Sequence, residues 1–161
     1  MTTTRRELLR TGWKIGGACL AVAAGWTLFE SLRPLGSSGK GTVINLGDPA
    51  NYPTGTATYV PEGRLFVANA SGHLFALSQK CPHLGCRVPF CDSSGHFECP
   101  CHGSRFDLGG EWFQGPAPRG MDRYDLSLVN GALIVNTSKL TPGPDRGAKE
   151  YFTPAKGPAC Q

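Results

Sequence analysis

Two short blocks of the sequence, CPHLGC and CPCHGS, contain six side chains that could bind a metal. The first block includes Cys81-x-His83 and the second includes Cys99-x-x-His102, so each offers one thiolate and one imidazole. Both groups are ligands of zinc and of iron–sulfur centres. Fifteen residues separate His83 from Cys99, which is enough for a hairpin that brings the blocks together. The pattern predicts a metal centre held between two loops.

Two kinds of metal centre fit these four ligands. One is a structural zinc site, but zinc fingers usually pair cysteine with cysteine and histidine with histidine, whereas each block here mixes the two types. The other is a two-iron two-sulfur cluster with two cysteines on one iron and two histidines on the other. Mixed pairs suit the cluster because each loop can then reach both irons. The sequence favours the cluster and leaves zinc as the alternative.

Each block also contains a cysteine that the centre does not need, namely Cys86 and Cys101. A disulfide between them would tie the two loops together beside the metal. Two free thiols are the alternative, which is weaker because both loops must converge on one centre anyway. Disulfides would in turn indicate an oxidising compartment.

The double block, together with GPAP at 115–118, resembles the Rieske iron–sulfur proteins of quinol-oxidising cytochrome bc complexes. The resemblance covers roughly residues 81–118. The Rieske ferredoxins of ring-hydroxylating dioxygenases share only the C-x-H and C-x-x-H ligand spacing, so Cys86 and Cys101 favour the bc type. The resemblance implies a Rieske-type [2Fe-2S] cluster, with the following ligands: Cys81 and Cys99 on the buried iron, His83 and His102 on the outer one.

The resemblance also implies roles for residues around the cluster. Leu84 would shield the cluster and touch the quinone, and the proline loop 115–118, with Pro116, would cover it from a third side. Ser104 matches a family hydroxyl that hydrogen-bonds a sulfur. The family usually has a tyrosine two residues later, where this chain has Phe106. Losing that donor should lower the reduction potential and suit a low-potential quinol such as menaquinol.

The function that follows from the resemblance is electron transfer. The protein would be the Rieske subunit of a quinol:cytochrome c reductase, an oxidoreductase of the respiratory chain. It would take one electron from quinol as a proton moves onto His83 or His102, and pass the electron to a c-type haem. Its partners would be a cytochrome b-type subunit with a quinol site, a c-type cytochrome and membrane lipid.

Two other functions compete with this one. The first is the small Rieske subunit of an arsenite-oxidase-like enzyme, and the second is a structural zinc-binding module of an envelope complex. Nucleic-acid binding is disfavoured, because the net charge of +4 comes with no basic stripe and no interleaved aromatic residues.

The chain must also position the metal centre, and it opens with Arg5 and Arg6 ahead of a long apolar run. Residues 1–12 resemble a twin-arginine export signal, although a basic flank that only orients a helix is an alternative. Residues 13–32 are long enough for one transmembrane helix. Residues 33–42, rich in glycine and serine, predict a flexible linker.

The basic flank also predicts a topology. Positive residues stay on the cytoplasmic side, so the N-terminus would be cytoplasmic and the remainder would lie on the outer, periplasmic side of the cell membrane. A cleaved signal peptide is the competing interpretation. It is disfavoured because no clear A-x-A site precedes the globular part.

Residues 43–161 are predicted to form an all-β Rieske head, with antiparallel sheets and a small cluster-binding subdomain at about 79–118. The content of 22 glycines and 13 prolines suits a loop-rich β domain. Turn signals at 71–72, 93–95 and 130–131 separate short apolar runs.

Four further residues lie outside the two blocks. Cys91 and Cys160 are predicted to form a second disulfide that fastens the C-terminal tail to the cluster hairpin. The alternatives are free thiols or pairing with another chain, since sequence does not fix connectivity. His73 and His96 are predicted to be surface histidines and not ligands.

Overall fold

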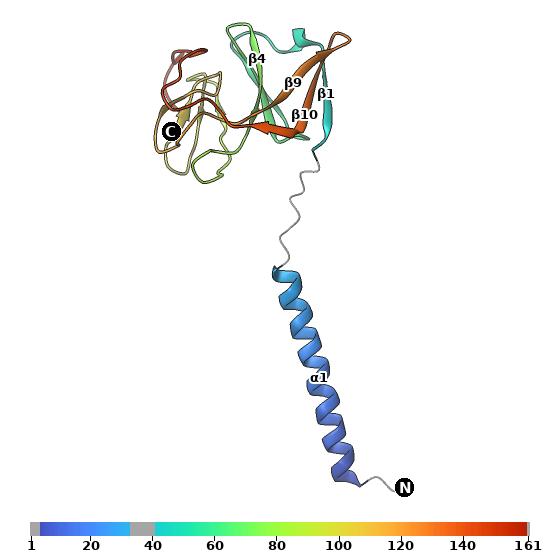
Figure 1. Ribbon diagram of the computed structural model, residues 1–161. Helices are drawn as coiled ribbons and strands as arrows, with labels where there is room; N and C mark the ends of the chain where they lie inside the picture. The colour runs from blue at the N-terminus through green and yellow to red at the C-terminus, as the bar shows by residue number, and fades with distance from the viewer. Residues whose placement is uncertain (1–3, 33–40, 161) are drawn as a thin grey trace. The chain divides into compact units, whose positions relative to one another are not determined.

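The structure, a computed structural model of the 161-residue chain, describes residues 4–32 and 41–160 (Figure 1). The described residues fall into two units, an N-terminal helix and a β-rich head. The predicted linker 33–42 lies outside the described residues except for Gly41 and Thr42, as do the first three residues of the predicted export signal.

The helix α1 spans Arg5–Leu32, so it begins well before the predicted membrane segment at 13–32. The cause is a capping box at its first turn. The Thr4 N–H donates to Glu7 Oε2 (3.0 Å), and the Glu7 N–H donates back to Thr4 Oγ1 (3.4 Å). Each bond satisfies a backbone donor that the start of a helix leaves unpaired. The arginine pair therefore lies on the helix.

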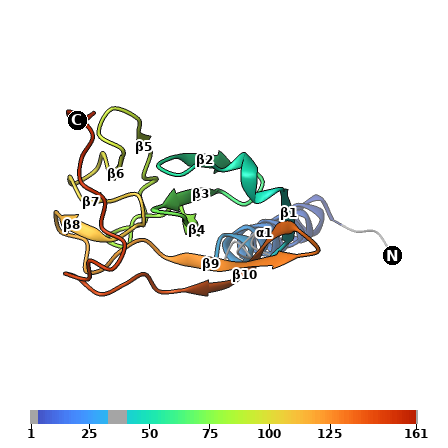
Figure 2. The same cartoon turned by 90° about the horizontal axis from the view of Figure 1, so that it is seen from above.

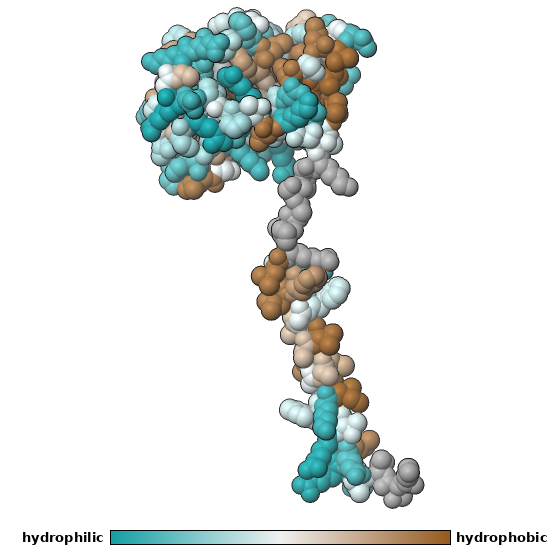
Figure 3. Space-filling model, in the orientation of Figure 1, coloured by the Kyte–Doolittle hydropathy of each residue, from teal (hydrophilic) through white to brown (hydrophobic). Residues whose placement is uncertain are grey.

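The helix α1 is long and apolar enough to cross a membrane, judged by its length and composition. Figure 3 shows apolar side chains along the helix and hydrophilic ones gathered toward its N-terminal end. None of its side chains is buried within the protein. An exposed apolar helix of this length is what a single membrane anchor requires.

The larger sheet of the head has six antiparallel strands in the order β1-β10-β9-β4-β3-β2. They are β1 (Val43–Gly47), β2 (Ala57–Val60), β3 (Leu65–Ala70), β4 (His73–Ser78), β9 (Arg123–Val129) and β10 (Ala132–Thr141), with a 3-10 turn at Pro49–Asn51. The predicted turns are confirmed: Ser71 and Gly72 join β3 to β4, and Asn130 and Gly131 join β9 to β10, all with positive φ. A tight hairpin turn needs that conformation.

The smaller sheet has four short antiparallel strands in the order β5-β6-β7-β8. They are β5 (Phe90–Cys91), β6 (His96–Glu98), β7 (Arg105–Phe106) and β8 (Trp112–Gln114). The chain enters this sheet after β4 and leaves it before β9, so the small sheet is an insertion that carries both cysteine–histidine blocks. Figure 2 shows its strands grouped beside the long β9–β10 hairpin, with the C-terminal tail running past β7 and β8.

The strand β3 links the two parts of the head, because all six of its residues are buried. Successive side chains on a strand point to opposite faces. Phe66 and Ala68 therefore join the core shared with the small sheet, where they meet Phe97 and Phe106. Leu65 joins a second core on the other face, made with β1, β9 and β10.

Candidate metal centre

The first cysteine–histidine block forms a tight loop, 81–86, closed by its own backbone. The Cys81 N–H donates to the Cys86 carbonyl (2.8 Å), and the Gly85 N–H donates to the Cys81 carbonyl (2.9 Å). Gly85 has φ of 79°, a left-handed conformation that glycine adopts without strain. The loop places half-buried His83 and exposed Leu84 at its tip, while Cys81 is buried at its base.

The second block, 99–104, forms the same loop again. The Cys99 N–H donates to the Ser104 carbonyl (2.8 Å), and the Gly103 N–H donates to the Cys99 carbonyl (3.1 Å), with Gly103 at φ of 70°. The histidine stands two residues before the glycine in the first block and one residue before it in the second. Both loops nevertheless close over the same number of residues. Two matching loops therefore face one another at the end of the small sheet.

The two loops separate the four candidate ligands into an inner and an outer pair. The thiols of Cys81 and Cys99 are buried, with 3% and 2% of each residue exposed. His83 is half-buried and His102 is exposed, and their rings lie at 90° with centroids 4.9 Å apart. Buried thiolates beside outer imidazoles are the donor set of a cluster with two cysteines on one iron and two histidines on the other.

The four ligands do not converge on a single point. In the described part of the chain, no three of their ligand atoms all lie within 4.8 Å of one another. A tetrahedral zinc ion holds its ligands at ~2.0–2.3 Å and would draw all four that close together. The arrangement suits a centre with two metal ions, so the residues fit a [2Fe-2S] cluster better than zinc.

The electrostatics at the inner pair favour a bound cation. Burial raises the pKa of the Cys81 thiol, while hydrogen bonds from the His83 backbone and the Ser104 side chain lower it. Proximity to Cys99 raises the pKa further, because two thiolates would repel one another. A thiolate at this buried position therefore needs positive charge beside it, which metal ions supply.

A disulfide joins the two loops between Cys86 and Cys101, the pair that the sequence suggested. The sulfurs of this disulfide and of Cys99 all lie within 4.8 Å of one another. The crosslink therefore lies directly beside Cys99, one of the two candidate inner ligands. Its two sulfurs are bonded to one another and are not available as metal ligands.

Comparison with known proteins agrees with this geometry. The family of Rieske [2Fe-2S] domains matches residues 43–125, which is more than half of the chain. The chain belongs to the Rieske [2Fe-2S] family. The cofactor of this family is the two-iron two-sulfur cluster, and the all-β head with its inserted four-stranded sheet is the Rieske fold.

Relatives of this Rieske protein include iron-sulfur subunits of cytochrome b6-f complexes. It is 32% identical over 144 residues to the cytochrome b6-f complex iron-sulfur subunit of Prochlorococcus marinus (strain MIT 9515), which covers 80% of each chain. It is 29% identical over 123 residues to the subunit of the same name from Chlorobaculum thiosulfatiphilum, covering 74% of this chain and 68% of that one.

Solved structures similar to this Rieske protein include the plasma membrane Rieske protein of the cyanobacterium Synechocystis PCC 6803. That match has 30% identity and a TM-score of 0.46, and it covers 58% of this chain and 98% of the other. A chain of a hyperthermophilic respiratory complex III matches with 25% identity and a TM-score of 0.45, covering 77% of this chain and 98% of that one.

The proline loop, 115–118, packs against the second block. The Ala117 N–H donates to Ser104 Oγ (3.1 Å), and both residues are fully buried. Gly115 lies so close to the second block that a Cβ there would come within 2.5 Å of the Ser104 Cα. Only glycine fits, so the loop is pressed against the chain next to His102. Pro116, on the same loop, is exposed.

Two further predicted residues occupy opposite environments. Leu84 is 71% exposed at the tip of the first loop, next to His83. Phe106 is fully buried in the core between the two sheets, opposite Phe97 on β6. The ring of Phe106 has no hydroxyl to offer a sulfur, whereas Ser104 has one.

The C-terminal tail lies along the small sheet, where a second disulfide joins Cys91 to Cys160. Three buried carboxylates from the small sheet and its turns receive backbone N–H groups of the tail. The pairs are Glu98 with Cys160 (2.9 Å), Asp107 with Thr153 (2.8 Å) and Glu111 with Tyr151 (2.9 Å). Sequence reasoning gave none of these carboxylates a role.

The prediction that His96 is a surface histidine is wrong. His96 is 4% exposed, its Nε2 lies 2.9 Å from the Thr153 carbonyl, and its ring packs against Phe113. The tail covers it, which sequence spacing did not reveal. His73 is exposed, as predicted, and contacts Tyr151.

Asp107 has the most perturbed carboxyl group of the head. Its pKa is raised to about 6, mainly by burial and also by the charge of the nearby Glu111, against hydrogen bonds from the backbones of Glu111, Thr153 and Gly109 that lower it. Glu111 Oε2 and Arg123 Nε are buried without hydrogen-bond partners. Desolvation lowers the pKa of Arg123, while the charge of Glu111 raises it. These groups form a buried charged cluster under the tail.

Proposed function

We propose that this protein is the Rieske subunit of a cytochrome bc- or b6f-type complex, an electron-transfer component of a quinol-oxidising oxidoreductase. The observation that carries the proposal is the pair of outer imidazoles, His83 and His102, above two buried thiols on loops joined by a disulfide. The relatives named as cytochrome b6-f iron-sulfur subunits support the same assignment.

The cluster would be held by Cys81 and Cys99 on the inner side and by His83 and His102 on the outer side. When bound, it supplies a centre that accepts and releases one electron. The two loops and their disulfide keep the ligands in place, and the proline loop keeps water away from the inner pair.

The exposed imidazole of His102 would contact the quinol and accept its proton. With one ring nitrogen on the metal, the other can accept a hydrogen bond from a quinol hydroxyl and then take its proton. Half-buried His83 lies in reach of the same contact, since the two rings are 4.9 Å apart. Leu84 offers an apolar edge on which the quinol ring can rest.

Ser104 and Phe106 would set the reduction potential. The Ser104 oxygen accepts the Ala117 N–H, which leaves the hydroxyl hydrogen free to donate to the Cys81 sulfur. A hydrogen bond to the sulfur stabilises the reduced centre, and Phe106 contributes none. One donor in place of two favours a lower potential, which suits menaquinol as the electron donor.

The remaining assignments concern partners and placement. A cytochrome b-type subunit would supply the quinol site, and a c-type cytochrome would accept the electron. The two disulfides need an oxidising compartment, so the head would lie on the outer side of the cytoplasmic membrane, with α1 as its anchor and the N-terminus inside.

The test is to purify the tagged full chain from membranes in mild detergent and to identify its partners. We expect a cytochrome b-type subunit, and we expect menaquinol analogues to reduce the preparation faster than ubiquinol analogues. Co-purification with a molybdenum subunit would instead establish the arsenite-oxidase-like alternative. Stoichiometric zinc without iron would rule out electron transfer.

A further inference from the structure

One arginine of the C-terminal tail, Arg146, contacts the proline loop. Arg146 Nη2 donates a hydrogen bond to the Gly115 carbonyl (2.9 Å), and its guanidinium lies 3.8 Å from the centre of the Trp112 ring. Trp112 Nε1 donates to the same carbonyl (3.1 Å). The first carbonyl of the proline loop is therefore held by two donors, and the donors also stack on one another.

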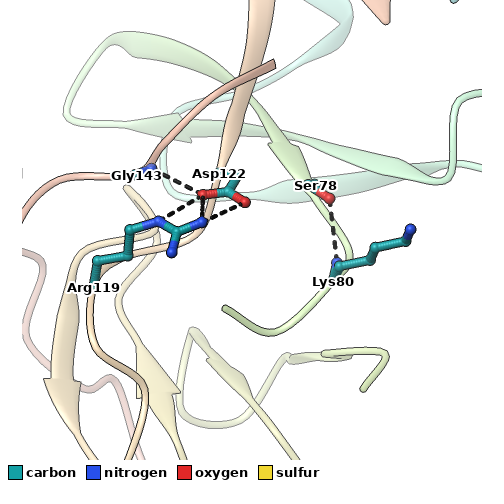
Figure 4. A network of polar contacts seen from close by, with 5 residues as sticks. All are labelled: Ser78, Lys80, Arg119, Asp122 and Gly143. Carbon is teal, nitrogen blue, oxygen red and sulfur yellow. Dashed lines mark hydrogen bonds and ion pairs between the residues drawn. The ribbon is translucent and has the colours of Figure 1, made fainter. Parts of the chain in front are cut away.

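The other end of the proline loop is held by the residues just before Arg146. The Gly120 N–H donates to the Pro144 carbonyl (2.8 Å). Asp122 accepts both the Arg119 guanidinium (2.8 Å) and the Gly143 N–H (3.0 Å), as Figure 4 shows. The segment 143–146 thus contacts the chain on both sides of the loop, and Arg146 is its contact on the side of Gly115.

A chain of contacts leads from this loop to an inner ligand. Gly115 is packed against Ser104, and the Ala117 N–H donates to Ser104 Oγ. Because that oxygen accepts the N–H, the Ser104 hydroxyl hydrogen is left free to donate to the Cys81 sulfur. Whatever fixes the loop therefore fixes the direction of the Ser104 hydroxyl.

We propose that Arg146 is a positioning residue for the cluster cover, acting through the Gly115 carbonyl and Ser104. The inference rests on the cluster site of the proposed function, and it does not depend on which quinol or partner the protein uses. Arginine suits the role because a flat guanidinium can stack on Trp112 and donate in its own plane at once. A lysine ammonium keeps the charge but offers no flat face to stack.

The first test is hydrogen exchange of the full-length, cluster-containing protein, followed by mass spectrometry of a peptide that includes 115–120. Pro116 and Pro118 have no N–H, so within 116–118 only Ala117 has a backbone amide that can exchange. We expect Arg146→Ala to speed its exchange by about tenfold, as expected for the loss of one hydrogen bond and one cation–π contact. Arg146→Lys should restore only part of the protection.

The matched control is Lys149→Ala. Lys149 is also an exposed cation of the tail, and it lies over the ring of Phe152, whereas Arg146 lies over that of Trp112. This variant removes the same charge and should leave Ala117 exchange unchanged. Equal effects of the two variants, or full protection in Arg146→Lys, would overturn the proposal.

The second readout is the reduction potential, which loss of a charge without a role in the proline loop should change less. A freed Ser104 hydroxyl points less often at Cys81, so Arg146→Ala and Trp112→Phe should each lower the potential, while Lys149→Ala lowers it less. An unchanged potential in Arg146→Ala would refute the proposal even if the exchange rate rises. Absence of a paramagnetic centre in the reduced wild type would instead contradict the proposed function.

Discussion

The two sheets of the head are stabilised in different ways. In the larger sheet, β9 has seven residues and β10 has ten, and long backbone ladders join neighbours through tight turns. In the small sheet no strand exceeds three residues, and the pairings cover only a few positions. The larger sheet is held mainly by its own backbone, whereas the small sheet depends on contacts from outside its strands.

Those outside contacts are two disulfides, three buried carboxylates and a tail. Much of the small part must be loop, since loops carry the ligands, and loops give little backbone pairing of their own. Crosslinks and buried hydrogen bonds then supply the rigidity that a metal site needs. This protein therefore keeps its stable framework and the loops that carry its candidate ligands separate, and β3 joins their cores.

The largest expected effect comes from removing an inner ligand. Cys99→Ser should abolish the cluster, because the buried site loses one of its two thiolates, yet the larger sheet should persist. Iron and acid-labile sulfide analysis would report the first, and circular dichroism the second. Cys19→Ser, on the exposed face of α1, is the control and should change neither. Loss of all strand signal in Cys99→Ser would mean that the two sheets are not separable.

The two disulfides should have different effects, one mainly on the free energy of unfolding and the other on retention of the cluster. Loop-closure arguments assign about 3 kcal/mol to a bridge spanning 15 residues and somewhat over 4 kcal/mol to one spanning 69. Cys91→Ser with Cys160→Ser should therefore cost more unfolding free energy than Cys86→Ser with Cys101→Ser. Only the loss of Cys86–Cys101 should deplete the cluster, because this disulfide lies beside Cys99. Denaturant titration and iron content measure the two effects, and a reversed pattern would contradict the account.

A smaller effect is expected at Phe106. Phe106→Tyr would add the second hydroxyl that the family usually has, and a hydrogen bond of ~1.4 kcal/mol to a charged sulfur corresponds to a rise of roughly 60 mV for one electron. Phe75→Tyr, on a half-buried ring of β4, is the control and should leave the potential unchanged. The measurement is a redox titration followed by paramagnetic resonance. An unaltered potential in Phe106→Tyr would mean that the missing hydroxyl does not set it.

The smallest effect concerns the buried charge under the tail. The pKa of Asp107 is raised to about 6, so between about pH 4 and pH 6 the folded protein keeps a proton that the unfolded chain has released. Stability therefore falls as pH rises through this window, by about 1.3 kcal/mol from pH 5 to pH 7. Asp107→Asn removes this pH-dependent contribution to stability. Melting temperatures of wild type and variant, measured at both pH values, should show the wild type losing stability relative to the variant as pH rises. The same difference in melting temperature at both pH values would contradict the raised pKa of Asp107.

The parts predicted from sequence are those fixed by local chemistry. The turn at Asn130–Gly131 and the one at Ser71–Gly72 follow from residues that tolerate positive φ, so their hairpins were predictable. The early start of α1 was missed although its signal is present, as Thr4 and Glu7 stand three residues apart in a capping box.

The parts that sequence did not predict depend on distant contacts. Asp107 and Glu111 receive N–H groups from the tail some 40 residues later, and His96 is buried by that same tail. The hydrogen bond from Arg146 to the Gly115 carbonyl joins residues that are 31 positions apart in the sequence. No periodicity or spacing links such positions, because irregular segments pack by side-chain detail and not by a repeating pattern.

In the proposed centre, His83 and His102 are both ligands of one two-iron cluster. Pulsed paramagnetic resonance of the reduced full-length protein, grown with nitrogen-15 histidine, tests this directly. We expect couplings from two histidine nitrogens at a centre with two irons and two sulfides per chain. Coupling to one histidine or none, or a metal-replete protein without a paramagnetic centre on reduction, would contradict it.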